Sequence, residues 1–544
     1  MNLELARTAV NCAQRIVEGM GLHLALQVRS EGRFSRQKLD TMQPEAFVYA
    51  RVLSEVTAAH AVLAYAEKAK ASYEQSLSYV YIASVLRNLQ QAVLFRREVF
   101  GLSQSSWQDL QSQQGFIAST LSTQFLSQVA GELLEREGGW SGEYGIEDDH
   151  EEIRRLFAKV ADERLSQVAE HIHRHDEIIP EDLLAEYAEL GVFGISIPEE
   201  FGGNFIDHLS MCLATEELSR GSLGAGGSVI TRPEICSKAI LKGGTDEQKH
   251  HWLPLIASGE KIVSVAVTEP NAGSDVASVR VTAKPVEGGY VINGEKTWCT
   301  FAGRANVFIL LARTGKIEDG HRGLTLFLVE KPAKISKDDH HHFVYEQPGK
   351  GRCEGHAIPT IGYRGMHSFS VTFEDFFVPT ENRIGEEGKG FILQMQGFSG
   401  GRIQTAARAV GLMEAALRSA IEYTKERKIF GKALSEYSLT QTKLAEMAAN
   451  VMASRQLSYH VAQLMDEGKG AMEASLVKLI ACKDAEWVTR EAMQLHGGMG
   501  YSEEYAVSRY WVDARVLSIF EGAEEVLALY VVARQSLKDI LSSM

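Results

Sequence analysis

Cysteine is scarce in this sequence, with six residues among 544 and no two spaced as a C-x-x-C pair. The six are Cys12, Cys212, Cys236, Cys299, Cys353 and Cys482. A disulfide framework or a zinc module requires cysteines at short, recurring spacings, which this chain lacks. The composition therefore predicts reduced thiols in a cytoplasmic protein.

The chain also lacks an excess of basic residues, a long apolar run and a targeting leader. Lys and Arg number 56 against 71 Asp and Glu, so the net charge is -15 and a broad basic face for nucleic acid is excluded. No apolar run approaches the roughly 20 residues of a membrane span. Glu4 and Glu18 argue against a transit peptide. We expect no nucleic-acid partner and no membrane span.

Hydrophobic periodicity divides the chain into helical, β-rich and helical parts. Residues 1–137 show mostly three-and-four apolar spacing in four successive stretches, one of them over 104–137. Helical spacing continues to about residue 258, β-rich segments occupy 261–379, and long helical patterns return from Gly388 onward. The predicted fold class is α+β. Its domains are a helical extension (1–145), a helical domain (146–260), an antiparallel β domain (261–384) and a C-terminal helical bundle (385–544).

A polar stretch inside the β-rich part, residues 332–360, contains the trio His340-His341-His342. Adjacent histidines are compatible with metal binding. However, no carboxylate or cysteine stands at a useful ligand spacing from them. We interpret 332–360 as a solvated loop and expect no metal site.

A carboxylate near the C-terminus is the first candidate for chemistry. Glu521 stands between Phe520 and Gly522, where one helical pattern ends and the last begins, with apolar runs on both sides. A carboxylate in such surroundings is a candidate general base. Alternatively, Glu521 is a first-turn acid that the dipole of the final helix favours.

Seven motifs follow one another in the second part of the chain. They are Thr268–Asp275 (TEPNAGSD), Asn293–Thr300 (NGEKTWCT), Gly362–Ser368 (GYRGMHS), the GKGF and GR pairs between Gly388 and Arg402, Arg427–Gly431 (RKIFG), Gln494–Tyr501 (QLHGGMGY) and Phe520–Val526 (FEGAEEV). Their residues and their order resemble the signatures of the acyl-CoA dehydrogenase family, over about residues 150–544. The resemblance implies a helical domain, a middle antiparallel β domain and a C-terminal four-helix bundle, with residues 1–145 outside it.

The resemblance implies an FAD-dependent enzyme that desaturates an acyl-CoA thioester. Glu521 would remove the α-proton while a hydride leaves Cβ for the flavin, and the backbone N–H of Glu521 would stabilise the charge on the thioester carbonyl. Ala523 replaces the threonine usual after E-G, so Glu525 or water would take over one flavin hydrogen bond. The expected flavin contacts within the subunit are Thr268, Ser274, Trp298, Thr300 and Glu525.

A second set of residues would reach the FAD of a neighbouring subunit, which implies a homodimer or homotetramer. This set is Arg427, Phe430, Gln441, Gln494 and Gly498. Taken alone, Trp298 is more typical of core packing, and Arg427 of a surface ion pair. Members of the family pass their electrons to an electron-transfer flavoprotein, so the resemblance implies this partner.

The substrate side of the site is expected at Arg402, Ser274, Gly522 and Arg232. Arg232 stands in the helix that lines the acyl end of the family's pocket, where a fatty acyl chain would meet apolar residues. Its guanidinium could pair with the distal carboxylate of a dicarboxylic acyl-CoA. Alternatively, Arg232 points to solvent or pairs with Glu234 or Glu217.

The extension, Arg232 and the F-E-G-A variant together resemble the subgroup of the family that converts (2S)-methylsuccinyl-CoA to mesaconyl-CoA. Three alternatives stay open: a short- or branched-chain acyl-CoA dehydrogenase, an acyl-CoA oxidase that uses O₂, and a non-catalytic flavin-fold scaffold. The extension would cover an oligomer surface, restrict the substrate entrance or bind a partner.

Overall fold

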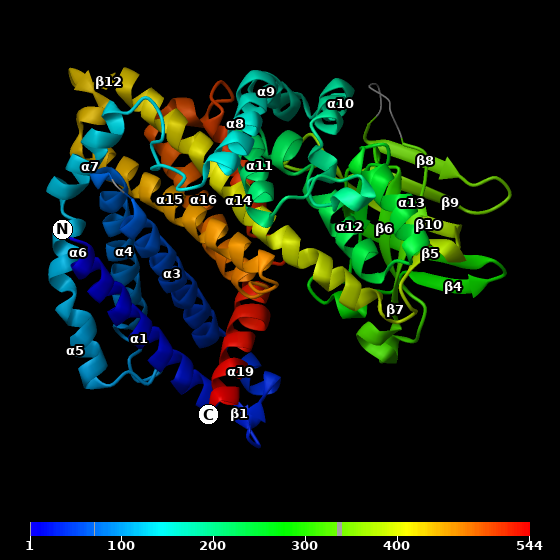
Figure 1. The fold of residues 1–544 in the computed structure, drawn as a ribbon, viewed down its shortest axis with the longest axis horizontal. Helices are drawn as coiled ribbons and strands as arrows, with labels where there is room; N and C mark the ends of the chain where they lie inside the picture. The colour runs from blue at the N-terminus through cyan, green and yellow to red at the C-terminus, as the bar shows by residue number, and fades with distance from the viewer. Residues whose placement is uncertain (1, 70, 334–339) are drawn as a thin grey trace. The chain divides into compact units, whose positions relative to one another are not determined.

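The computed structural model describes residues 2–69, 71–333 and 340–544 (Figure 1). The chain forms two compact units: unit 1 comprises Met1–Arg155 and Thr405–Met544, and unit 2 comprises Leu156–Gln404. Helices form both ends of the chain and a β-sheet forms its middle. The predicted α+β class is confirmed.

Unit 1 is mainly helical. Its helices are α1 (Leu3–Gln27), α2 (Arg36–Asp40), α3 (Gln43–Lys68), α4 (Ser72–Val93), α5 (Gln104–Ser112), α6 (Gln114–Thr120), α7 (Thr123–Glu135), α15 (Ser438–Asp466), α16 (Glu473–Leu495), η9 (Gly497–Tyr501), α17 (Val507–Leu517), α18 (Glu524–Val526), η10 (Leu527–Ala533) and α19 (Arg534–Ser543), and α8 (Asp148–Val160) and α14 (Gly390–Glu426) run across its boundaries. Two short hairpins join β1 (Arg29–Ser30) to β2 (Arg33–Phe34) and β12 (Lys428–Ile429) to β13 (Lys432–Ala433).

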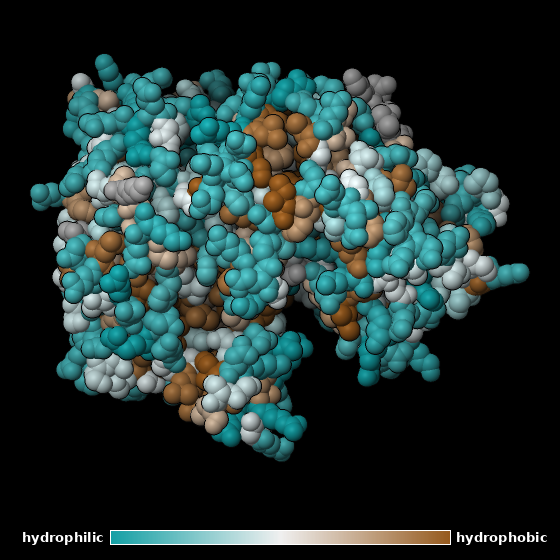
Figure 2. All heavy atoms as spheres, in the orientation of Figure 1, coloured by the Kyte–Doolittle hydropathy of each residue, from teal (hydrophilic) through white to brown (hydrophobic). Residues whose placement is uncertain are grey.

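The N-terminal extension packs on the C-terminal helices. Helices α3, α4 and α7 contact α15, α3 also contacts α16 and η10, and α1 contacts α19 (Figure 1). On the face shown in Figure 2, hydrophilic side chains cover much of the outer surface of this extension. The extension therefore buries its apolar side chains against the last 140 residues of the chain, from Thr405 to Met544.

Helix α3 is the only helix in the described ranges that is long and apolar enough to cross a membrane by composition. It contacts α1, α4 and α15, and Val52, Val56 and Val62 on it are fully buried. A helix that is apolar on most sides is expected where other helices surround it. Its packing explains its composition without a membrane.

The single helix expected over 104–137 is divided into α5, α6 and α7. Between α6 and α7, Ser122 Oγ accepts a hydrogen bond from Phe125 N. Ser122 is the N-cap of α7, and a capped start requires an extended residue that interrupts the preceding helix. The apolar spacing predicted the helical state but not these breaks.

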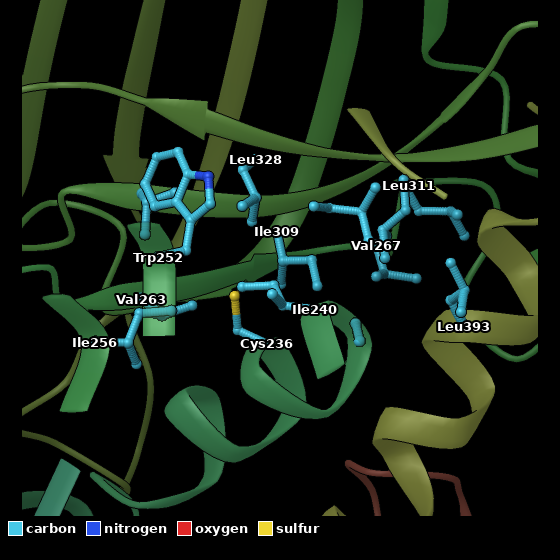
Figure 3. Close-up of a cluster of buried hydrophobic side chains, with 14 of the residues drawn as sticks. Cys236, Ile240, Trp252, Ile256, Val263, Val267, Ile309, Leu311, Leu328 and Leu393 are labelled. Atoms are coloured by element: carbon cyan, nitrogen blue, oxygen red, sulfur yellow. The ribbon is translucent and has the colours of Figure 1, made fainter. Parts of the chain in front are cut away.

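Unit 2 places helices against one face of a sheet. Its helical segments before the sheet are η1 (Ala161–Leu165), α9 (Ser166–His175), α10 (Glu181–Glu189), η2 (Val192–Gly194), η3 (Glu199–Phe201), α11 (His208–Gly221), η4 (Leu223–Gly227), α12 (Thr231–Gly243) and α13 (Asp246–Ala257). Three short ones, η5 (Val276–Ser278), η6 (Ile317–Gly323) and η7 (Thr380–Asn382), lie between strands. Figure 3 shows Cys236 of α12 and Trp252 of α13 turned toward Val263, Ile309 and Leu328 of the sheet. This apolar layer fixes α12, which carries Arg232, on the sheet.

The sheet of unit 2 has the strand order β11-β7-β6-β4-β5-β10-β9-β8, with β3 paired to β6. The strands are β3 (Val263–Ala266), β4 (Thr282–Val286), β5 (Gly289–Thr300), β6 (Val307–Arg313), β7 (Leu324–Glu330), β8 (His342–Glu346), β9 (Arg352–Ala357), β10 (Ser368–Pro379) and β11 (Arg383–Ile384). β3 and β6 are parallel, so the prediction of a purely antiparallel domain is wrong. The β4–β5 hairpin between them is long enough to return the chain to the same end of the sheet, which a parallel pair requires.

The interpretation of 332–360 as a loop is also wrong. Strands β8 and β9 pair antiparallel, with His342 opposite His356, while residues 334–339 lie outside the described residues. Phe343, Cys353 and Gly355 point inward from this pair. The alternation is short and polar residues flank it, so the strand signal in the sequence is weak.

A buried ion pair fastens the end of the extension to the C-terminal helices. Arg455 of α15 is fully buried and donates to Glu414 at 2.9 Å and to Ser141 Oγ at 2.6 Å. Ser141 also donates to Glu414 at 2.5 Å, and the Arg455 guanidinium lies 4.1 Å from the centre of the Tyr144 ring. Every member of the cluster has a polar or aromatic partner, so the 138–145 linker is held in one position.

We predict that Arg455→Met releases this linker, because Glu414 is left buried without its counter-ion. Removing one partner of a buried pair costs about 3–5 kcal/mol. The backbone amides around Glu143 should then exchange with deuterium about a hundredfold faster. The control is Arg7→Ala, which removes an exposed pair with Glu67 and should change exchange little. Equal exchange in Arg455→Met and wild type would contradict the prediction.

Asp484 of α16 makes the contact between α3 of the extension and α16 sensitive to pH. Burial, opposed by Lys483 and assisted by the nearby Glu55 of α3, raises the pKa of its carboxyl to about 7. An unfolded aspartate titrates near 4. The folded chain therefore retains a proton between about pH 4 and 7 that the unfolded chain has lost, and stability falls as pH rises through that window.

We predict that Asp484→Asn flattens the dependence of thermal stability on pH between 4 and 7, because the amide does not ionise. Melting temperatures of both proteins across this range measure the effect. Parallel profiles for variant and wild type would show that another group controls the dependence.

Candidate functional site

Glu521 lies in the turn between α17 and α18 of unit 1, in a backbone conformation that few residues adopt. Its φ is +55°, and that of Gly522 is +100°. Glycine is required at 522 for two reasons. Its positive φ is strained for other residues, and a Cβ there would stand 2.8 Å from Leu527 Cδ2. A non-glycine residue in the left-handed region persists only where its surroundings enforce it, and such positions cluster at functional sites.

Two buried cations enforce this turn. Lys478 of α16 donates from Nζ to the carbonyls of Phe520 and Gly522, both at 2.5 Å. Arg408 of α14 is fully buried, with Nη2 3.9 Å from Glu521 Oε1 and its guanidinium 4.7 Å from the centre of the Phe520 ring. The backbone on both sides of Glu521 and its carboxylate are thus held by positive charge.

The sequence reasoning missed both cations. Each stands inside an apolar stretch, in Ala406-Ala407-Arg408-Ala409-Val410 and in Leu476-Val477-Lys478-Leu479-Ile480. A single charge on a buried helix face was the available signal, because such a charge requires a partner.

The predicted flavin residues of unit 2 gather where β3 and β5 meet. Thr297 N donates to Thr268 O at 2.9 Å, and Thr300 Oγ1 lies 3.0 Å from Ser368 Oγ. Trp298 has a φ of +58° and is 55% exposed, so it is not the core residue that its type suggests. A register shift in the β10–β5 pairing between Phe369 and Val371 lies opposite this part of β5. An exposed aromatic plane beside hydroxyl groups fits a flat, hydrogen-bonding ring system.

A buried pair connects the motif turn to β5. Lys296 Nζ lies 2.8 Å from Glu269 Oε1, and the same carboxylate accepts hydrogen bonds from the backbone N–H of Arg280 and Val281. Burial lowers the pKa of Lys296, while Glu269 opposes this effect. The pair holds Thr268 beside β5, whereas Ser274, further along the turn, is exposed.

Arg232 is buried at the start of α12, with 5% of its surface exposed. It donates to Ser228 O at 2.5 Å and to Tyr363 Oη at 2.7 Å, and Nη1 lies 3.8 Å from Met366 Sδ. Among the described residues, no carboxylate lies within 4.0 Å of its guanidinium. The two alternatives for Arg232, solvent exposure or pairing with Glu234 or Glu217, are therefore wrong.

Both candidate acids have other partners. Glu234 accepts hydrogen bonds from Lys238 Nζ and Gln404 Nε2, and Glu217 accepts one from Arg220 at 2.7 Å. Arg232 thus has neutral partners alone, although a buried guanidinium is costly without an anion.

The residues expected to reach a neighbouring subunit lie on the surface of unit 1. Phe430 stands at the tip of the β12–β13 hairpin and is 96% exposed, and Arg427 is exposed at the base of that hairpin. Gln494 and Gly498 are exposed at the end of α16 and in η9. Gln441 is partly buried and donates to Ser435 O at 3.1 Å. Arg402 lies in the unit 2 part of α14, and Glu525 is exposed in α18.

Comparisons with known proteins identify the family of the chain. Sequence models of the acyl-CoA dehydrogenase family match at residues 147–260 (N-terminal domain), 264–376 (middle domain) and 388–537 (C-terminal domain). The chain belongs to the acyl-CoA dehydrogenase family, and it is an FAD-dependent oxidoreductase. The residues around Thr268, Trp298 and Thr300 fit that cofactor.

One curated relative and two solved structures illustrate the similarity. The (2S)-methylsuccinyl-CoA dehydrogenase of Cereibacter sphaeroides is 45% identical over 398 residues, which are 73% of this chain and 71% of the relative. A structure described as the electron transferring flavoprotein of Acidaminococcus fermentans matches with a TM-score of 0.66 and 33% identity, over 72% of this chain and 98% of that one. A glutaryl-coenzyme A dehydrogenase in complex with glutaryl-CoA matches with a TM-score of 0.66 and 28% identity, over 72% and 95%.

We predict that Lys478→Met lowers kcat for acyl-CoA oxidation about a hundredfold, because the carbonyls of Phe520 and Gly522 lose their donor and the turn shifts. Displacing a reacting group by about 1 Å has an effect of this size. Steady-state kinetics measure it, with circular dichroism to verify folding. Lys483→Met is the matched control on the same helix, since Lys483 pairs with Glu55. A kcat within threefold of wild type in Lys478→Met would show that the turn does not depend on Lys478.

Proposed function

We propose that this protein oxidises a branched dicarboxylic acyl-CoA, (2S)-methylsuccinyl-CoA, to the α,β-unsaturated thioester mesaconyl-CoA. The relative from Cereibacter sphaeroides named for this reaction supports the proposal. The glutaryl-CoA complex supports it further, because a dicarboxylic thioester is bound there on the same fold.

The observation that carries the proposal is the buried guanidinium of Arg232 without a carboxylate partner. A fatty acyl chain would leave this charge uncompensated. The distal carboxylate of a dicarboxylic thioester would pair with it, and the hydroxyl of Tyr363, 2.7 Å away, would hold the guanidinium plane in place. Arg232 is then the residue that selects a dicarboxylic substrate.

Glu521 is the proposed catalytic base. Its carboxylate takes the proton from Cα, and the Cα–Cβ double bond forms as a hydride leaves Cβ. When bound, FAD accepts that hydride. Arg408 orients the carboxylate through its 3.9 Å contact, so that one oxygen is held in a fixed direction.

Lys478 prepares the other half of the site. In a trans peptide the carbonyl of Phe520 and the N–H of Glu521 point in opposite directions. Because Lys478 holds the carbonyl, the N–H is directed away from Lys478, and within the described chain it makes no hydrogen bond to another residue. This N–H is the donor we assign to the thioester carbonyl, where negative charge develops as the α-proton leaves.

We also propose a homo-oligomer in the cytoplasm that passes electrons to an electron-transfer flavoprotein. Phe430, Tyr501 and Leu439 expose at least 69% of their surface on unit 1. A partner subunit would cover Phe430 and reach its own FAD with Arg427. Sedimentation of the purified protein should show a dimer or tetramer, and a monomer at micromolar concentration would contradict this assignment.

The test of the proposed function is an anaerobic titration of the FAD-loaded protein, in which loss of the oxidised flavin absorbance reports substrate oxidation. Methylsuccinyl-CoA should bleach the flavin of wild type and butyryl-CoA should not. Arg232→Met should lose the reaction with methylsuccinyl-CoA, because its distal carboxylate has no counter-ion. Arg352→Ala, which removes an exposed arginine of the same unit, is the control.

Glu521→Gln separates binding from chemistry in the same titration. It should bind methylsuccinyl-CoA and leave the flavin oxidised, because the amide accepts no proton. Bleaching of wild type by butyryl-CoA, independent of Arg232, would instead assign the protein to fatty-acyl oxidation. Rapid reoxidation by O₂ without a flavoprotein acceptor would identify an oxidase.

A further inference from the structure

Asp176 of unit 2 is contacted by three histidines that lie far from it in the sequence. It follows α9 directly and has a φ of +55°. His367 Nε2 lies 3.1 Å from its Oδ1, His341 Nε2 lies 3.2 Å from its Oδ2, and His340 Nε2 lies 3.0 Å from its backbone oxygen. Arg364 Nε lies 3.1 Å from Oδ1 on the same carboxylate. The sequence has no carboxylate at a useful ligand spacing from His340. In the fold, Asp176 provides one from 164 residues earlier in the chain.

The ring nitrogens of these histidines are divided into bonded and unbonded ones. The Nε2 atoms face Asp176, whereas the Nδ1 atoms of His340 and His367 are buried and have no hydrogen-bond partner among the described residues. Leaving a buried polar nitrogen unpaired costs about 1–3 kcal/mol. In metal sites, a ligating histidine donates its other N–H to a carboxylate or a backbone carbonyl, which fixes the ring with its free nitrogen toward the ion. His340 and His367 have this arrangement.

We propose that His340, His341 and His367 bind one divalent ion of the kind that prefers imidazole, with Zn²⁺ as its representative, and that Asp176 holds the rings from behind. One ring nitrogen of each histidine lies within 4.8 Å of those of the other two. Zinc–nitrogen bonds of about 2.0–2.1 Å place tetrahedral ligands roughly 3.4 Å apart, so the rings must turn and move closer together to bind an ion. Water or a fourth donor completes the coordination.

A second group, His342, Glu354 and His356, lacks the same features. Both histidines contact one oxygen of Glu354, at 2.9 and 3.2 Å, and their rings stack at 4.4 Å on the paired strands β8 and β9. His356 is exposed and no ring nitrogen of this group is both buried and unpaired in the described residues. It serves as a control rather than as a site.

The proposed ion would stabilise a segment that the catalytic site depends on. His367 is adjacent to Ser368, whose hydroxyl contacts Thr300, and to Met366, whose carbonyl accepts from Phe301 N at 2.7 Å. Tyr363 of the same segment holds Arg232. The ion is therefore structural: it would fix the 363–368 segment without contacting the reacting atoms.

The experiment uses the full-length protein after treatment with a chelator and gel filtration. Titration with Co²⁺ followed by visible absorption, and with Zn²⁺ followed by elemental analysis, should give one ion per chain with the intense bands of low-symmetry cobalt. His341→Ala removes a ligand from an exposed position, so folding should persist, and it should weaken binding at least a hundredfold. Zn²⁺ should raise the melting temperature of wild type and leave that of His341→Ala unchanged.

The matched control is the double variant His342→Ala with His356→Ala, which should retain one ion with wild-type affinity. Loss of binding in this control, or undiminished binding in His341→Ala, would place the ion elsewhere and overturn the proposal. Absence of stoichiometric binding in wild type would also overturn it. None of these outcomes depends on the substrate, so the proposed function can fail or stand independently.

Discussion

A buried positive charge must be compensated, and this requirement organises both units. The effective penalty for removing an ion from water is several kcal/mol, and it is offset only by close, well-oriented partners. Arg455 meets it with Glu414, and Lys296 meets it with Glu269. Lys478 meets it with two backbone carbonyls. In each case the charge fixes a segment that has little regular structure: the linker, the motif turn and the turn that carries Glu521.

Arg232 differs from these cations, since its protein partners are neutral oxygens and a thioether. Pre-organisation of this kind favours a ligand anion, because the protein has already oriented the donor before binding. The hydroxyl of Tyr363 and the carbonyl of Ser228 stabilise the guanidinium enough to keep it folded inside unit 2. They do not neutralise it.

The sequence predicted the order of helical and β-rich parts because hydrophobic periodicity is a local property. It also predicted Glu521, Trp298 and Arg232 as site residues, because these stand in motifs or in an apolar context that makes a polar residue conspicuous. What it could not predict depends on contacts between distant segments. The parallel β3–β6 pair spans the hairpin between them. Arg408 and Lys478 acquire their role from a turn that lies 40 to more than 100 residues away along the chain.

The histidines give the clearest example of this limit. Local spacing assigned His340, His341 and His342 to one loop. In the fold, the first two face Asp176, whereas the third lies in β8 and pairs with His356 of β9. A spacing rule compares only residues that are close in sequence, so it cannot detect the carboxylate of Asp176, which follows α9.

The union of the first 155 residues with the last 140 in one unit has a consequence for synthesis. Helices α3 and α4 emerge from the ribosome long before α15 and α16, the surfaces that cover them. At roughly 5–20 residues per second, the roughly 340 residues between α4 and α15 take about 17–70 s to make. During that interval the apolar side of the extension has no native partner, so the nascent chain is most exposed to aggregation before its final third is translated, and a chaperone that shields α3 would act in that window.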